Sequence, residues 1–260
     1  MPISWMSRQG QRTRTNNDAA AVGHKDHYLL AMLVDAADKG SNGQGLAQHW
    51  AQTIVRAALS GNQPPDIASI TQLMREQQRE LRHHYLHEIA SYCCVLIDLQ
   101  SRQLHILHAG DCLVGTQQAN GRIDWLTTPH TLSNQPPYAQ LPPATEAAEQ
   151  RHLLTRSLNA RSFCAPDSYA TVLEPAASLL LCTDGYWYEH LKQGVDLQQL
   201  QDDASVLSLT LGEPTNRQQT DCDNFFIIAP SPADSLPRSQ QASRLESELA
   251  TTPVDKPKLP

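Results

Sequence analysis

Five aspartates lie at the ends of apolar segments and carry the clearest chemical signal in the sequence. Asp35 follows LLAMLV, Asp111 follows LHILHAG and Asp184 follows LLLCT. Asp18 precedes AAAV, and Asp223 precedes NFFIIA. A rigid sheet can direct carboxylates at its strand ends to one point, and hard divalent cations such as Mg²⁺ prefer these oxygens. The pattern predicts a divalent cation site, and a pair of ions about 3.5–4 Å apart is the usual arrangement for hydrolysing phosphate esters.

Other aspartates have a plainer interpretation. A single Asp at the end of a strand is more often a turn former or a helix cap than a metal ligand. We expect this structural role for Asp98, in the turn of a hairpin, and for the remaining candidates Asp38, Asp124, Asp167 and Asp202. Spacing alone leaves both interpretations of the strand-end aspartates open.

The elements that must position these carboxylates can be read from the apolar periodicity. Continuous or alternating apolar runs predict strands over residues 28–34, 92–98, 103–109, 114–118, 122–126, 179–182 and 225–229. Helical spacing covers residues 45–60, 67–89, 186–192 and 197–211. Asn120-Gly121 marks a hairpin. Strands outnumber helices and several form hairpins, so we expect an α+β fold with largely antiparallel sheets.

Composition excludes several classes of function. The 260 residues carry a formal charge of −7, which disfavours a nucleic-acid-binding surface. The longest apolar run, residues 29–34, is far shorter than a membrane helix, and no secretory signal opens the sequence, so we expect a cytoplasmic protein. The cysteines show no metal-ligand spacing and are interpreted as small hydrophobic residues: Cys93, Cys94, Cys112, Cys164, Cys182 and Cys222.

We expect one folded domain over residues 1–230. Residues 231–260 are rich in Pro, Ser and charge without apolar periodicity, which predicts a flexible tail. Residues 134–149 are rich in Pro and Ala and predict a long surface loop.

The order of the segments resembles the metal-dependent type 2C (PPM-type) protein Ser/Thr phosphatases, as a divergent, bacterial-like member. The resemblance spans residues 7–229. It rests on seven motifs in the family's order, which are GQRTRTNNDA, LLAMLVDAADKG, LHILHAGDCLVG, WLTTPH, LLTRSLN, LLLCTDGYW and DNFFIIA.

The resemblance implies a fold, a site and a reaction. The fold is a sandwich of two antiparallel sheets with helices on both outer faces. The reaction is hydrolysis of phosphoserine or phosphothreonine by a metal-activated water, with two Mn or Mg ions. Asp111 falls on a position that helps to hold a weaker third metal in related enzymes, and the departures from the family pattern disfavour that third site. The residues that fall on metal-site positions are Asp18, Asp35, Ala36 (through its carbonyl), Asp111, Asp184 and Asp223.

Several positions depart from the family pattern. Asn17 replaces a Glu that supports the second metal, and Thr13 falls on the phosphate-binding Arg. Arg12 and Arg14 flank Thr13, and we select Arg14 as the phosphate-binding candidate. The DGxGG loop reads Asp35-Ala36-Ala37-Asp38-Lys39, so Asp38 or Lys39 could supply a new polar group. Further departures are Leu113, Pro129 and Tyr188.

Two main functions remain open from the sequence, and a phosphatase for small phosphoesters is a third possibility. The first is an active phosphatase, expected to be a monomer that acts on a phosphoprotein and opposes a Ser/Thr kinase, without nucleic acid or membrane. The second is a degenerate phosphatase fold that serves as a regulatory or binding module. His130 could donate a proton to the leaving group, although we favour a surface loop position. We interpret His83, His84 and His87 as a solvated helix face.

Overall fold

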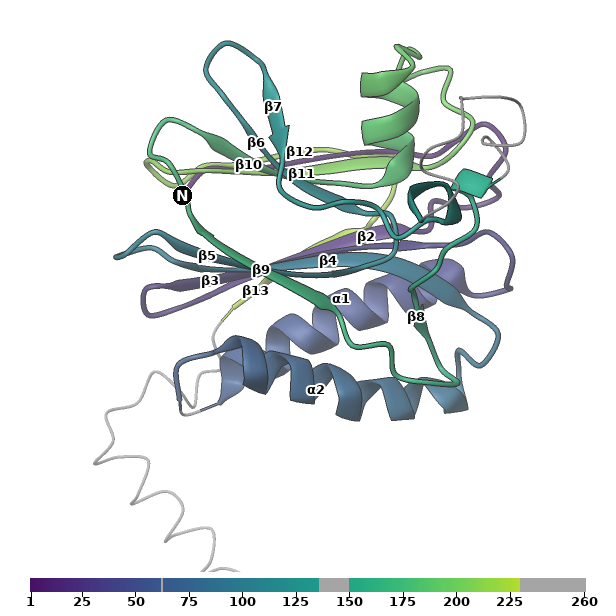
Figure 1. Cartoon of the computed structure of the whole chain (residues 1–260), viewed down its shortest axis with the longest axis horizontal. Coiled ribbons are helices and arrows are strands. Elements are labelled where there is room, and N and C mark those ends of the chain that lie inside the picture. Colours follow the sequence, from purple (N-terminus) through teal and green to yellow (C-terminus); the bar gives the residue numbers. More distant parts are fainter. Residues whose placement is uncertain (62, 136–149, 230–260) are drawn as a thin grey trace, which may run out of the picture.

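The computed structural model describes residues 1–61, 63–135 and 150–229 and contains two β-sheets packed face to face (Figure 1). The six-stranded sheet has the order β12 (Asn216–Gln219), β1 (Ile3–Arg8), β11 (Ala204–Thr210), β10 (Ser178–Cys182), β6 (Leu113–Gln117) and β7 (Ile123–Trp125). The seven-stranded sheet consists of β13 (Phe225–Ile228), β2 (Asp18–Lys25), β3 (Tyr28–Ala36), β4 (Ile89–Asp98), β5 (Gln103–Ala109) and β9 (Asp167–Val172), and β8 (Leu158–Asn159) also pairs with β4. The expected α+β sandwich is confirmed.

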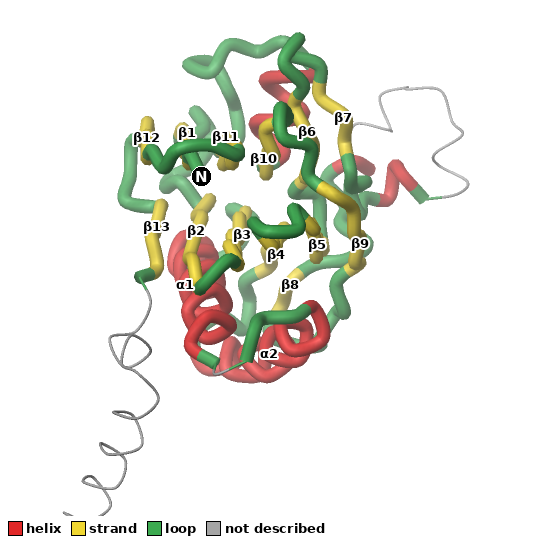
Figure 2. The backbone as a smooth tube through the Cα atoms, turned by 90° about the vertical axis from the view of Figure 1, so that its left-hand side faces the viewer, coloured by secondary structure: helices red, strands yellow, loops and turns green. Residues whose placement is uncertain are grey.

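The space between the sheets is the main apolar core. Side chains alternate along each strand, so every second residue of a central strand points inward. Trp5, Leu33, Val95, Leu181 and Leu207 are buried in one cluster between the two sheets. Figure 2 shows the two rows of strands one above the other, with the long helices beneath the seven-stranded sheet.

Helices cover both outer faces, as expected. Helices α1 (Gly43–Ser60) and α2 (Ile67–Glu80) lie on the seven-stranded sheet, and Trp50 of α1 is buried there. The π-helix η4 (Gly185–Lys192) covers the six-stranded sheet, where Trp187 packs with Leu180. The α1 and α2 segments were both found from their apolar stripes.

Three expectations for local structure need correction. The helix expected over 67–89 ends at Glu80, because a 3₁₀ turn follows at Leu81–His83 and β4 starts at Ile89. The helix expected over 197–211 is wrong, since the strand β11 occupies its second half between β1 and β10. Two pairs at one side of the sandwich, β1 with β12 and β2 with β13, are parallel.

Several smaller expectations can be compared with the described residues. The hairpin at Asn120-Gly121 joins β6 to β7, and Gly121 has the positive φ of +86° that such a turn favours. Every cysteine is a free thiol, and four of the six are buried. Among the described helices, none combines the length and apolar character that crossing a membrane would demand. The proposed tail, 231–260, and nearly all of the proposed loop, 134–149, lie outside the described residues.

Asn224 connects the C-terminal strand to the rest of the sandwich. Its side-chain oxygen accepts a hydrogen bond from Trp5 Nε1 at 3.0 Å, and its amide donates to Ser7 Oγ at 2.8 Å and to the Asp18 carbonyl at 3.1 Å. Asn224 and its three hydrogen-bond partners are fully buried. Asn224 therefore fixes the start of β13 against β1 and β2.

We expect Asn224→Ala to lower the free energy of unfolding by about 1–3 kcal/mol, because the buried Trp5 N–H would lose its partner. Urea unfolding followed by tryptophan fluorescence measures this difference. Asn216→Ala, an exposed position on the edge strand β12, is the matched control and should leave the urea midpoint unchanged. Equal midpoints for Asn224→Ala and the wild type would contradict the structural role.

Candidate active site

A cavity of about 450 Å³ opens at one end of the sandwich, where strands of both sheets terminate. The geometry follows from the pairing register. Asp35 pairs with Asp18 across β2 and β3, while Cys182, two residues before Asp184, pairs with Leu113 on one side and Val206 on the other. The sheets therefore bring to one place carboxylates that are distant in sequence. Those that line the cavity are Asp35, Asp38, Asp111, Asp184, Asp202 and Asp203.

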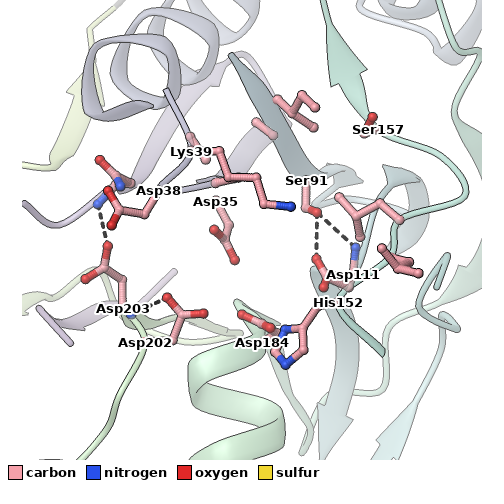
Figure 3. A pocket seen from close by; sticks show the side chains of 17 residues that line it. Asp35, Asp38, Lys39, Ser91, Asp111, His152, Ser157, Asp184, Asp202 and Asp203 are labelled. Carbon is pink, nitrogen blue, oxygen red and sulfur yellow. Dashed lines mark hydrogen bonds between the residues drawn. The ribbon is translucent and has the colours of Figure 1, made fainter. Parts of the chain in front are cut away.

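Asp35, Asp184 and Asp202 form the centre of the cavity wall (Figure 3). They come from the end of β3, the residues after β10 and the residues before β11. Burial, followed by the charge of Asp184, raises the pKa of Asp202 to about 7. Burial, followed by the neighbouring Asp18 and Asp184, holds the pKa of Asp35 well above its usual range. This mutual repulsion is what a bound cation would relieve.

Asp111 lies beside this centre and is held by β4. Its Oδ1 accepts a hydrogen bond from Ser91 Oγ at 2.6 Å, and Ser91 Oγ accepts from the Asp111 amide at 3.1 Å. Gly110 has a φ of +101°, and a Cβ there would lie 2.1 Å from Ser91 Oγ, so only glycine permits this approach. Burial and Asp184 raise the pKa of Asp111 to about 7.

Asp203 lines the cavity, whereas Asp18 does not. Asp18 is fully buried, and its Oδ2 accepts a hydrogen bond from Thr183 Oγ1 at 3.2 Å. Asp203 Oδ1 accepts from the Gly10 amide and from Thr13 Oγ1, at 2.9 and 2.6 Å. Its Oδ2 accepts from the Asn17 amide at 2.7 Å. Asp203 thus fixes the N-terminal segment to the start of β11.

The structure does not bring Asp223 to this cavity. Asp223 is exposed, outside the cavity lining, and its backbone carbonyl accepts a hydrogen bond from Gln48 Nε2. Asp202, interpreted from the sequence as a turn or cap residue, lines the cavity instead. The signal that could have revealed it is the alternating run ASVLSLT directly after Asp202-Asp203, which is typical of a strand. Asp38, interpreted in the same way, also lines the cavity.

The arginines near Thr13 also differ from the expectation. Arg14 is exposed and lines a neighbouring hollow of about 470 Å³ instead of the main cavity, and Arg12 lines neither. Arg151, which no motif singled out, donates from Nη1 to Asp184 Oδ2 at 3.0 Å. Its guanidinium lies over the Tyr188 ring, 3.8 Å from the ring centre. Arg151 thereby orients Asp184 and offsets part of its charge.

His130 is buried, which corrects the surface position expected for it. Its Nδ1 accepts a hydrogen bond from the Gly110 amide at 3.2 Å, and its Nε2 lies 3.0 Å from Asp167 Oδ2. Its ring stacks on His108 with the centroids 4.5 Å apart. His108, His130 and Asp167 could each offer a ligand atom to one ion. Both nitrogens of His130 are already engaged, however, so the cluster serves to fix the Gly110 turn that carries Asp111.

The remaining residues that the sequence singled out either line the cavity or lie on the surface. Ala36 is buried and lines the cavity. Asn17 also lines it. His83, His84 and His87 are exposed, as expected for a solvated face. Asp98 accepts hydrogen bonds from the Gln100 and Ser101 amides in the β4–β5 turn, which confirms its structural role.

The donor set fits hard divalent cations. Carboxylate and carbonyl oxygens in a half-open cavity suit Mg²⁺ or Mn²⁺, and none of the described lining residues offers a thiolate. Burial first, and then the charges of neighbouring aspartates, raise the pKa values of these carboxyl groups, and a bound cation would offset both effects. The residues present therefore fit a metal centre of the kind expected from the sequence.

Comparison with known proteins assigns a family to this architecture. Residues 8–219 match the family model described as protein phosphatase 2C, and this match ends before Asp223. No curated protein matches the sequence. A bacterial serine phosphatase structure has a TM-score of 0.67 at 17% identity, covering 83% of this chain and 100% of that one.

Two further solved structures are similar. The serine/threonine phosphatase Stp1 from Staphylococcus aureus has a TM-score of 0.66 at 16% identity, covering 81% of this chain and 95% of that one. The PPM Ser-Thr phosphatase from Mycobacterium smegmatis in complex with cacodylate has a TM-score of 0.62 at 20% identity, covering 82% and 99%. At these identities the structures show a shared fold.

Proposed function

Because this chain belongs to the protein phosphatase 2C family, we propose that it is a metal-dependent protein serine/threonine phosphatase. The observation that carries the proposal is the convergence of Asp35, Asp184 and Asp202 in one cavity, from three separate strand ends. A structural remnant of an enzyme would have no need to keep these mutually repelling carboxyl groups together.

Asp35, Asp184, Asp202 and the Ala36 carbonyl would hold two Mn or Mg ions, with Asp111 at the edge of the centre and Asp18 behind it. When bound, such ions activate water and offset charge on the phosphoryl oxygens. Neighbouring side chains would orient the carboxylates that hold the ions. Arg151 orients Asp184, and Ser91 orients Asp111.

The exposed surroundings of the cavity suit a peptide chain. Leu153 lines the cavity and is 51% exposed, so it offers an apolar contact beside the carboxylates. We propose a phosphoprotein as substrate and a Ser/Thr kinase as the opposing activity, with the phosphatase acting as a monomer in the cytoplasm. Because the cavity is half-open, a phosphoserine or phosphothreonine side chain can enter it when only the substrate segment that carries the phosphate is unfolded.

A degenerate, non-catalytic phosphatase fold is the second candidate. It is favoured by Thr13, whose hydroxyl group is committed to Asp203, and by Asn17, which lacks the charge of a Glu at that position. This candidate predicts that Mn²⁺ leaves the melting temperature unchanged, whereas a metal enzyme is stabilised by its ion.

Hydrolysis of a phosphothreonine peptide with and without Mn²⁺ separates the two candidates. We expect turnover only with Mn²⁺, and we expect Asp184→Asn to reduce it by at least about 10²-fold, because this substitution removes a charged ligand. Circular dichroism confirms that the variant is folded. No turnover by folded wild-type protein at saturating Mn²⁺, together with an unchanged melting temperature, would favour the non-catalytic module.

A further inference from the structure

We propose that Lys39 is the residue that contacts the phosphoryl group of the substrate. The proposal rests on the proposed phosphatase function and assigns this role to a lysine at the end of the Asp35–Lys39 loop, in place of an arginine in the N-terminal segment. It follows from the charge of the cavity, from the positions of the nearby cations and from the way this loop is held.

The cavity needs a cation for a phosphate dianion to enter. Six aspartates line it, and like charges a few ångströms apart repel strongly wherever water is partly excluded. Bound metal ions would offset part of this negative charge, but the phosphoryl oxygens that do not contact a metal ion would still lie close to the lining carboxylates. A side chain with a fixed positive charge at the mouth of the cavity would bind these oxygens directly.

Lys39 is the one lysine or arginine among the described residues that line the cavity. Figure 3 shows its side chain extended past Asp35, with its amino group pointing toward Ser91. The ion pairs found between described residues do not include Lys39, so its charge is available to a ligand. Lysine binds phosphate as a point charge and needs no particular planar geometry.

The arginines near the cavity either bind other residues or lie outside its lining. Arg151 is engaged with Asp184 and stacked on Tyr188. Arg14 lines the neighbouring hollow, and Thr13 uses its hydroxyl group to bind Asp203. Lys39 lines both hollows and therefore stands at the wall between them.

Buried Glu88 fixes the loop that presents Lys39. Its Oε1 accepts hydrogen bonds from the Ser41 and Asn42 amides, at 3.0 and 2.9 Å. Gly40 approaches so closely that a Cβ there would lie 1.8 Å from Glu88 Oε2. On the other side of Lys39, the Ala37 amide donates to the Ile89 carbonyl at 2.9 Å. The backbone is therefore held on both sides of the lysine, which limits where its side chain can reach.

The test combines substrate kinetics with direct binding of inorganic phosphate to Mg²⁺-saturated protein, measured by calorimetry. We expect Lys39→Ala to lower kcat/KM for a phosphothreonine peptide by about 10²-fold and to weaken phosphate binding by about tenfold or more. Lys39→Arg keeps the charge and should restore most of both values. Lys25→Ala, at the far end of β2, is the matched control and should behave as wild type.

The metal-induced rise in melting temperature should be the same in Lys39→Ala and wild type, because Lys39 binds the anion and leaves the metal ligands unchanged. Phosphate binding that depends on Lys39 in a protein without turnover would support this proposal while contradicting the enzymatic function. Unchanged phosphate affinity in Lys39→Ala, loss of affinity in Arg14→Ala alone, or no phosphate binding by the wild type would each overturn the proposal.

Discussion

Asp202→Asn is expected to abolish Mn²⁺-dependent hydrolysis, with a loss of at least about 10²-fold, while leaving the protein folded. Asp202 lines the cavity together with Asp35 and Asp184, and burial followed by the charge of Asp184 raises its pKa to about 7, which a bound cation would counteract. Asparagine has nearly the same shape but no charge, so it weakens metal binding without creating a void. Steady-state kinetics across a Mn²⁺ titration measures the effect as a lower kcat and a higher metal requirement.

Asp223→Asn is the matched control for this experiment. Asp223 is exposed and does not line the cavity, so the substitution should leave kcat/KM within about twofold of wild type, as expected for a surface position. The reverse result, an active Asp202→Asn and an inactive Asp223→Asn, would show that the C-terminal aspartate rearranges to complete the site. It would overturn the assignment of Asp202.

The sequence predicts some of the cavity aspartates correctly and assigns the wrong role to Asp202 and Asp223. Asp35 follows an uninterrupted apolar run, and Asp111 and Asp184 follow largely apolar segments, so their strand-end positions were predictable from the sequence. The two central strands β3 and β4 each contain a long apolar run, residues 28–34 and 92–97, because both of their faces are buried, and such runs are the strongest strand signal. The long helix α1 has an equally clear apolar stripe.

Asp202 was missed because the secondary structure around it was misassigned. Residues 197–211 contain leucines at helical spacing, and the alternation of the β11 strand is blurred by two serines, Ser205 and Ser208. Ser205 is buried nonetheless, because its hydroxyl group donates to Ser7 Oγ at 2.8 Å and its amide donates to Thr183 Oγ1. Buried polar pairing of this kind depends on strand neighbours that are distant in sequence, and no local pattern reveals it.

The positions of Arg151 and His130 could not be predicted from the sequence for the same reason. Arg151 gains its role from Asp184 and Tyr188, more than thirty residues away, and it lies just before the LLTRSLN motif and outside it. His130 was expected in a surface loop, but this segment folds back over the end of β5 and buries the ring against His108. Long-range contacts decide both cases.

Mn²⁺ should raise the melting temperature much more at pH 7.5 than at pH 5.5. Without metal, Asp111 and Asp202 in the folded protein have pKa values of about 7, whereas an unfolded Asp titrates near 3.8. Between these values the folded state binds more protons than the unfolded state, so the stability of the metal-free protein that comes from these two groups falls as the pH rises. Metal needs the ionised carboxylates, so its affinity increases over the same window, by about tenfold per pH unit for each proton released.

The difference between melting curves with and without Mn²⁺ isolates this linkage. Burial and His130 lower the pKa of His108 to about 4, so His108 stabilises the fold as the pH rises from 4 to 6.5. Because His108 lies outside the cavity lining, this contribution is the same with and without metal and cancels in the difference. In Asp111→Asn, which removes one of the two titrating carboxyl groups, the Mn²⁺-induced rise should depend less steeply on pH. A rise of equal size at both pH values in the wild type would mean that the ion binds away from these carboxylates, and the metal centre would have to be placed elsewhere.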